Sequence, residues 1–261
     1  MESRLIIFLI GVSGALARCT GDACTAPCSC TAGDSSTDTE CTDAGLTAVP
    51  CNIKPDANGL YLSNNSISEI APGDLGALTS LQYLFADHND LTVLRAGVLP
   101  ATLGELFMPD NQIATVEAGA LPPGIVYIEL NNNMLDAVPP LHGVKPSALA
   151  TLSLTNNSIG PALTRAAFDA VRGANSSALG DINLGGNRIE TVDEGTFDDL
   201  PALAVYSGRL CLERNPLNCC GLEWLRSMDA LDELCPGAAT CAAPASVRGK
   251  ALKKTKGTIC P

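Results

Sequence analysis

One pattern, repeated seven times, decides what this chain can fold into. Its clearest copy runs from Leu149 to Ile159 and reads Leu-x-x-Leu-x-Leu-x-x-Asn-x-Ile. Successive asparagines are separated by 24, 22, 22, 24, 30 and 28 residues. A period of this size predicts a solenoid, because one short repeat cannot bury its apolar face and only stacked neighbours make a core. The seven asparagines are Asn65, Asn89, Asn111, Asn133, Asn157, Asn187 and Asn215.

The residues before each asparagine have the alternation of a strand with one buried face. Apolar side chains lie three and five places before it and alternate with mostly polar or aromatic neighbours. The asparagine is expected to point inward and form a ladder, since a side-chain amide can satisfy backbone donors and acceptors where the chain leaves the strand. The expected buried pairs are Leu60/Leu62, Leu84/Ala86, Leu106/Met108, Ile128/Leu130, Leu152/Leu154, Ile182/Leu184 and Leu210/Leu212.

This pattern resembles the extracellular leucine-rich repeat family, with cysteine caps at both ends. The layout is similar to variable lymphocyte receptors, Slit-type repeats and platelet adhesion receptors. The resemblance implies an α/β solenoid, a leucine-rich repeat horseshoe with a parallel concave sheet, and a protein or glycan ligand on that sheet. It also implies four cap disulfides: Cys24–Cys30 and Cys28–Cys41 at the amino end, and Cys219–Cys241 and Cys220–Cys260 at the carboxyl end. The adjacent pair Cys219-Cys220 departs from the Cys-x-Cys that is usual in the family.

Twelve cysteines and the amino terminus both indicate an oxidising, extracellular location. An apolar run from Leu5 to Ala17 ends in a small-x-small cleavage pattern and is too short to span a bilayer. We therefore expect a signal peptide at 1–17, an amino-terminal cap at 18–51, repeats at 52–214 and a carboxy-terminal cap at 215–261, with no membrane span in this chain. A longer receptor trimmed at its cap would have the same sequence.

The remaining cysteines permit extra bridges from Cys19 to Cys51 and from Cys211 to Cys235, although sequence does not fix connectivity. A zinc site is the alternative for the four amino-terminal cap cysteines, and it is disfavoured by secretion and by the absence of a nearby histidine.

Residues that alternate with the buried leucines should form one continuous concave surface. Aromatic residues crowd into its first four strands and are flanked by acids, a combination that favours binding of a partner with basic groups. The alternative is that aromatic residues simply favour strands. The expected ligand-binding residues are Tyr61, Tyr83, Phe85, Asp87, Glu105, Phe107, Asp110, Tyr127 and Glu129. Glycosylation acceptor patterns occur at Asn64, Asn156 and Asn175.

Composition excludes several other functions. A formal charge of −12 argues against nucleic-acid binding. The two histidines, His88 and His142, lie in no nucleophile or metal signature, so we expect no enzyme, no cofactor and no metal. A metal ion gathered by Asp87, His88 and Asp110 is a weaker alternative.

Two alternatives to a recognition module stay open. A structural matrix protein would bind through its rim, its glycans or the basic end of the chain, which carries Arg248, Lys250, Lys253, Lys254 and Lys256. A membrane-receptor fragment would continue past Pro261. The pattern does not define the ligand or the oligomeric state.

Overall fold

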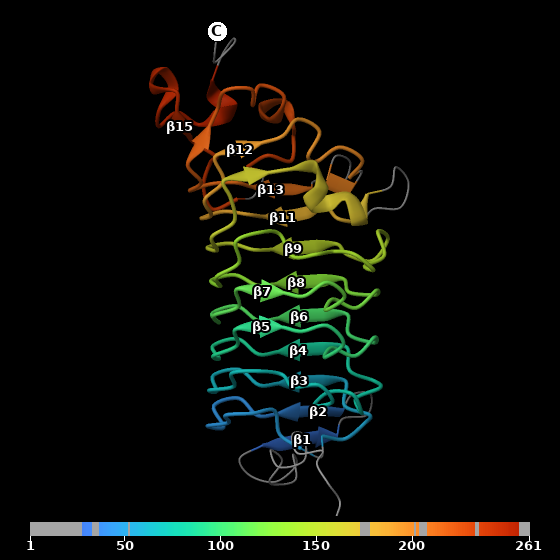
Figure 1. Ribbon diagram of the computed structural model, residues 1–261. Coiled ribbons are helices and arrows are strands. Elements are labelled where there is room, and N and C mark those ends of the chain that lie inside the picture. Colours follow the sequence, from blue (N-terminus) through green and yellow to red (C-terminus); the bar gives the residue numbers. More distant parts are fainter. Residues whose placement is uncertain are drawn as a thin grey trace, which may run out of the picture.

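The computed structural model describes residues 28–32, 37–51, 53–172, 178–200, 202–203, 208–232 and 235–255. They form one elongated solenoid, with the short strands of successive turns stacked from β1 at one end toward β15 at the other (Figure 1). The leucine-rich repeat solenoid predicted from the sequence is thus confirmed. The expected signal peptide at 1–17 lies outside the described residues, and the cap and repeat boundaries stay predictions.

A nine-stranded sheet lines one side of the solenoid. All its neighbouring strands pair in parallel except β1 and β2, which form an antiparallel pair at the amino end. This pair makes the sheet two strands longer than the seven repeats predict. In spatial order the strands are β1 (Ser29–Ala32), β2 (Thr37–Glu40), β3 (Gly59–Tyr61), β4 (Tyr83–Phe85), β6 (Glu105–Phe107), β8 (Tyr127–Glu129), β9 (Thr151–Ser153), β11 (Asp181–Asn183) and β13 (Arg209–Cys211).

Each repeat strand of this sheet, from β3 to β13, buries its middle residue, and these residues lie in register along the sheet. Leu84 pairs with Leu60 on one side and Leu106 on the other, and all three are fully buried. The second apolar position of each repeat is also buried, including the small Ala86. The side chains on either side of a buried leucine therefore face the opposite, solvent side, because successive residues of a strand point to opposite faces.

The asparagine ladder forms as expected. Asn133, for example, accepts the Ile113 N–H at 2.8 Å and donates its amide to the carbonyl oxygens of Met108, Leu130 and Asn131 at 3.0–3.1 Å. One side chain therefore joins two successive turns of the solenoid. Equivalent bonds occur at the other six asparagines, each of which accepts an N–H from the preceding turn.

The residue before each ladder asparagine has a left-handed backbone, a feature the sequence analysis missed. In six of the seven turns this residue is not glycine, with φ between 52° and 56°. Asparagine, aspartate and glycine tolerate this conformation best. The six are Asn64, His88, Asp110, Asn132, Asn156 and Arg214, and Gly186 is the seventh.

The convex side consists of turns, two-residue strands and short 3-10 helices within the described residues. Apolar residues about ten places after five of the seven asparagines form a buried spine on this side: Leu75, Leu99, Leu121, Phe168 and Phe197. The strands are β5 (Val93–Leu94), β7 (Thr115–Val116), β10 (Ala162–Leu163) and β12 (Thr191–Val192). The 3-10 helix of the longest repeat is η1 (Arg165–Val171), and three more follow the last repeat: η2 (Leu225–Ser227), η3 (Ala245–Val247) and η4 (Leu252–Lys254).

The longest repeat is attached to its neighbour by the Arg172 side chain, which is 9% exposed. Its guanidinium donates to the backbone carbonyls of Arg165, Gly195, Thr196 and Asp198. This single cation therefore satisfies carbonyl groups where the convex turns are least regular.

Disulfides lie near both ends of the solenoid. Cys28–Cys41 and Cys219–Cys241 are the pairs implied by the family resemblance, and Cys211–Cys235 is the extra bridge that the sequence permits. Cys219–Cys241 joins the turn after β14 (Leu217–Asn218) to β15 (Cys241–Ala243).

Cys51 and Cys220 are also disulfide-bonded. The expected bridges Cys19–Cys51, Cys24–Cys30 and Cys220–Cys260 depend on Cys19, Cys24 and Cys260 or on the Cys30 side chain, which lie outside the described residues. Those pairings stay predictions.

Candidate ligand-binding face

Four aromatic rings form a continuous stack on the solvent side of the sheet, here called the ring ladder. Tyr61, Phe85 and Phe107 occupy the same register position on β3, β4 and β6. Their centroids are 4.9 and 4.4 Å apart, with interplanar angles of 5° and 2°. Tyr127 of β8 extends the stack diagonally, at 4.8 Å from Phe107. All four side chains are half-buried, so each still has surface that a partner could contact.

The repeat geometry explains the ladder. Neighbouring strands lie about 4.8 Å apart, which falls within the roughly 4.5–7 Å range of centroid separations that aromatic pairs prefer. The buried leucines on either side fix each strand in register. The rings therefore hold one another in place before any ligand arrives. Aromatic groups that are rigid in this way contribute contact area with little loss of side-chain entropy, which is the property of interface hot spots.

The carboxy-terminal end of the ladder is held by a polar network. Tyr127 donates to Glu129 Oε2 at 3.2 Å, and Asn131 donates to Glu129 Oε1 at 2.9 Å. Asn131 in turn accepts the Ser153 hydroxyl at 2.9 Å and the Thr155 N–H at 2.7 Å. The Glu129 carboxylate is therefore oriented beside the ring ladder by two donors.

This network predicts an unusual titration. Burial raises the pKa of Tyr127 to about 12, with the charge of Glu129 and its hydrogen bond as further causes. Because this value lies above the ordinary 10.0, Tyr127 contributes stability below pH 10 that is lost as the pH rises toward about 12. Absorbance of tyrosinate should show a late-ionising tyrosine that Tyr127→Phe removes and that Glu129→Gln shifts to lower pH. An unchanged late phase in both variants would contradict this assignment.

A second group of predicted residues lies where the strands end. Asp87 accepts the Ser63 hydroxyl and approaches His88 Nδ1 at 3.0 Å, and Asp110 Oδ2 lies 3.8 Å from His88 Nε2. The hydrogen bond to Asp87 raises the pKa of His88. Asp110 also accepts the Asn132 amide at 2.8 Å. These side chains therefore interact with one another in a row at the ends of the strands.

The last two predicted residues, Tyr83 and Glu105, lie at the first position of their strands. They are in register with each other and with Tyr127, and both are half-buried. All nine predicted residues therefore share one face. Four form the ring ladder, Glu129 is held at its end, Asp87 and Asp110 flank His88, and Tyr83 and Glu105 lie beside the ladder.

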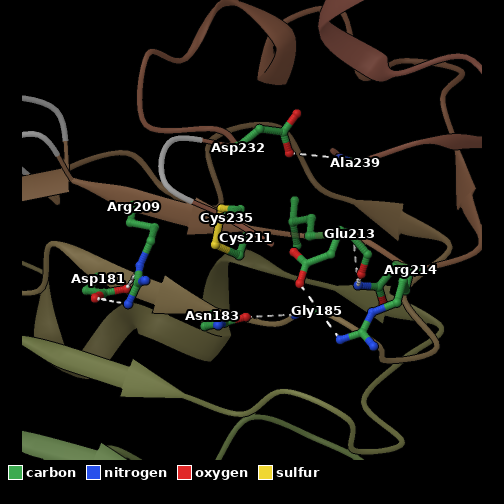
Figure 2. Close-up of a disulfide and its surroundings, with 12 residues drawn as sticks. Asp181, Asn183, Gly185, Arg209, Cys211, Glu213, Arg214, Asp232, Cys235 and Ala239 are labelled. Carbon is green, nitrogen blue, oxygen red and sulfur yellow. Dashed lines mark hydrogen bonds and ion pairs between the residues drawn. A yellow bond between two sulfur atoms is a disulfide. The ribbon is translucent and has the colours of Figure 1, made fainter. Parts of the chain in front are cut away.

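The metal alternative gains no support from the placement of Asp87, His88 and Asp110. Within the described part of the chain, the cluster whose ligand atoms lie within 4.8 Å of one another is Cys211, Glu213 and Cys235. Its two sulfur atoms are bonded to each other (Figure 2), so they are not free to ligate an ion.

Two acidic residues of this face, Asp38 and Glu40, were missed by the sequence analysis. They belong to β2, where Asp38 is in register with Gly59 and Glu40 with Tyr61. The signal for this strand is weak, because Thr39 occupies the buried position that leucine or isoleucine takes in the repeats. The face is thus more acidic at its amino end than the repeats alone predict.

The carboxyl end of the face differs in character. Arg209 of β13 donates Nε to Asp181 of β11 at 2.8 Å, and its Nη2 binds the second carboxylate oxygen (Figure 2). Glu213 lies nearby and is 2% exposed, and neither of its carboxylate oxygens has a hydrogen-bond partner among the described residues. Arg214 Nη2 approaches Glu213 Oε1 at 3.9 Å. A Cβ on Gly185 would lie 2.2 Å from that oxygen, so a larger residue there would displace the Glu213 side chain.

Backbone geometry gives a second reason for the asparagines of two glycosylation patterns. Asn64 and Asn156 occupy the left-handed position before a ladder asparagine, where asparagine is favoured without any glycan. Both are exposed, and Asn156 donates to Asn132 at 2.8 Å. Asn175 lies outside the described residues. Glycosylation at the three sites stays a prediction.

Comparison with known proteins gives relatives of one kind. The chain is 29% identical to human leucine-rich repeats and immunoglobulin-like domains protein 1 over 178 residues, 68% of this chain and 13% of that protein. It is 34% identical to mouse transforming growth factor beta activator LRRC32 over 128 residues, 46% of this chain and 19% of that protein. It is 32% identical to pig biglycan over 162 residues, 62% of this chain and 49% of that protein. The chain thus spans less than half the length of each of these relatives.

The fold has a solved counterpart in human trophoblast glycoprotein. The TM-score is 0.59 at 22% identity, with 91% of this chain and 98% of that chain covered. No family model matches the chain.

The fold and the relatives define the class: the chain is a leucine-rich repeat protein with disulfides near both ends of its solenoid. Its curated relatives are extracellular leucine-rich repeat proteins, which fits a non-catalytic ectodomain. Among the described residues, no helix has the length and apolarity that crossing a membrane requires.

Proposed function

We propose that this protein is an extracellular, secreted recognition module that binds a protein or glycan ligand on the concave face of its sheet, without catalysis. The observation that carries the proposal is the ring ladder. Four pre-ordered, half-buried aromatic groups on one open sheet are more than the solenoid needs for its own core, which lies on the other side of the strands.

The surroundings of the ladder support a partner with basic groups. Six carboxylates lie on β2 to β8 or in the turn that follows a strand: Asp38, Glu40, Asp87, Glu105, Asp110 and Glu129. The described strands from β1 to β9 contain no lysine, arginine or histidine. Such a field attracts a cationic partner and discourages an anionic one.

Partner capture tests this function. Secreted protein comprising residues 18–261 would be used to capture partners from cell-surface and matrix extract, beside the variant Phe85→Ser, Phe107→Ser. We expect the variant to lose specific partners, because it removes the two central rings and leaves the buried leucines in place. Matched thermal unfolding of the two proteins is the control for folding. Partners captured equally by both proteins would contradict the proposal and favour the rim or the basic end of the chain.

A further inference from the structure

The interior faces of the ring ladder are already covered. Phe85 has Tyr61 on one face and Phe107 on the other, both nearly parallel to it. A planar group from a ligand can therefore meet the edges of the inner rings but can stack on a ring face only at the two ends of the ladder. The two ends differ in the charges that surround them.

The carboxyl end already has a guanidinium group nearby. Beyond Tyr127 lie Asp181 and Arg209, joined by two hydrogen bonds. The charges of both act on the Tyr127 hydroxyl, that of Asp181 raising its pKa and that of Arg209 lowering it. At this end of the ladder the chain itself therefore supplies an arginine paired with a carboxylate.

Among the described residues, the strand beside Tyr61 at the amino end, β2, supplies carboxylates and no cation. Glu40 is in register with Tyr61, and Asp38 lies beside Gly59. A Cβ on Gly59 would lie 2.7 Å from Asp38 Oδ1 and 3.0 Å from Tyr61 Cε2, so the absence of a side chain at Gly59 leaves room for both groups beside it. Glu40 is oriented by the Thr42 N–H, which donates to Oε1 at 2.9 Å.

The amino-terminal cap has one basic residue, Arg18, at its first position. From Cys19 to Ile53 it contains no lysine, arginine or histidine, whereas Asp22, Asp34, Asp38, Glu40 and Asp43 are all acidic. Burial and the charges of Asp38 and Glu40 raise the pKa of Tyr61. The ring therefore lies in a negative potential that a cation would neutralise.

We propose that the outer face of Tyr61 receives an arginine side chain of a protein partner, held between the carboxylates of Asp38 and Glu40. The inference rests on the proposed function and names the partner chemistry of the same surface. A guanidinium is planar, stacks on an aromatic face and binds carboxylates through paired N–H groups, whereas the ammonium of lysine is a strongly hydrated point charge. At the other end of the ladder, a guanidinium and a carboxylate are both supplied by this chain, in the ion pair of Arg209 and Asp181.

Synthetic peptides separate these chemistries. The probe is an eight-residue peptide of alternating arginine and serine, compared with the same peptide carrying lysine or citrulline, by titration calorimetry at physiological salt. We expect the arginine peptide to bind at least about tenfold more tightly than the citrulline peptide, which keeps the planar shape and lacks the charge. The lysine peptide should bind with intermediate affinity.

Matched variants locate the site. Asp38→Asn with Glu40→Gln should weaken binding of the arginine peptide by about tenfold or more, since both charges are lost while the shapes are kept. Asp136→Asn with Glu194→Gln changes two exposed acids outside the sheet by the same charge and should leave binding unchanged. Tyr61→Leu should reduce the preference for arginine over lysine.

The outcomes separate this inference from the proposed function. Equal binding of the arginine and citrulline peptides, or full affinity in the Asp38/Glu40 variant, overturns the arginine site. If the Phe85/Phe107 variant still loses captured partners in that case, concave-face recognition stands without it. If that variant retains its partners, the proposed function fails whatever the peptides do.

Discussion

Phe168→Ala is expected to lower the free energy of unfolding by about 3–5 kcal/mol, a value typical of removing a fully buried ring. Phe168 is 0% exposed and lies in the convex spine, and its ring centroid is 5.7 Å from that of Phe197. Alanine would leave a cavity between two repeats that cannot collapse, since the backbones of both turns are fixed by strand pairing. Urea unfolding followed by circular dichroism would measure the loss.

Phe85→Ala is the matched control for Phe168→Ala, because the chemical change is the same. Its ring is half-buried and contacts other ladder rings rather than the core, so the expected cost is about 1–3 kcal/mol, the sum of two ring pairs. For ligand binding we expect the reverse order: Phe85→Ala should weaken binding strongly, and Phe168→Ala should leave the affinity of the folded protein unchanged. Equal stability costs at the two positions would show that the ladder is part of the core.

Asn133→Ala is expected to destabilise the protein by about 2–4 kcal/mol, because the buried Ile113 N–H and several carbonyl groups lose their partner together. The side chain is 8% exposed, so water cannot replace these bonds without opening the turn. Loss at one turn also weakens both neighbouring interfaces, since each repeat is stabilised by the repeats beside it.

Gln112→Ala provides the control in the same repeat. Gln112 is exposed and bonds only Asp90 at 3.1 Å through its side chain, so its loss should change stability by less than about 0.5 kcal/mol. If Asn133→Ala lowered the stability as little as Gln112→Ala, the asparagine ladder would reflect the turn preference of asparagine rather than stabilise the fold.

Much of this fold can be predicted from the sequence because the same residue pattern recurs in each repeat. Leu84 or Leu106 alone predicts little, but seven apolar pairs at constant offset from an asparagine fix the strand register, the buried face and the asparagine ladder. The nine predicted site residues share one face for the same reason. The period-two alternation is sufficient by itself to place Phe85 and Phe107 at equivalent positions of adjacent strands.

What sequence reasoning missed lies where the repeat is absent or where contacts are diagonal. Strand β2 has Thr39 at its buried position, so Asp38 and Glu40 carry no repeat signal. Tyr127 occupies a different register position from Phe107, and their stacking depends on ring direction rather than spacing. The left-handed residue before each asparagine varies in identity from His88 to Arg214, which conceals a backbone geometry that the seven turns share.

Hydroxyl-radical footprinting of the protein bound to a captured partner tests most directly whether the ring ladder is the recognition surface. Aromatic side chains react readily when exposed, so free and bound protein can be compared ring by ring. We expect Tyr61, Phe85, Phe107 and Tyr127 to lose reactivity together on binding, while the reactivity of the exposed Met134 stays unchanged. Full reactivity of all four rings in the complex, with protection at the convex side or at the basic end of the chain, would contradict it.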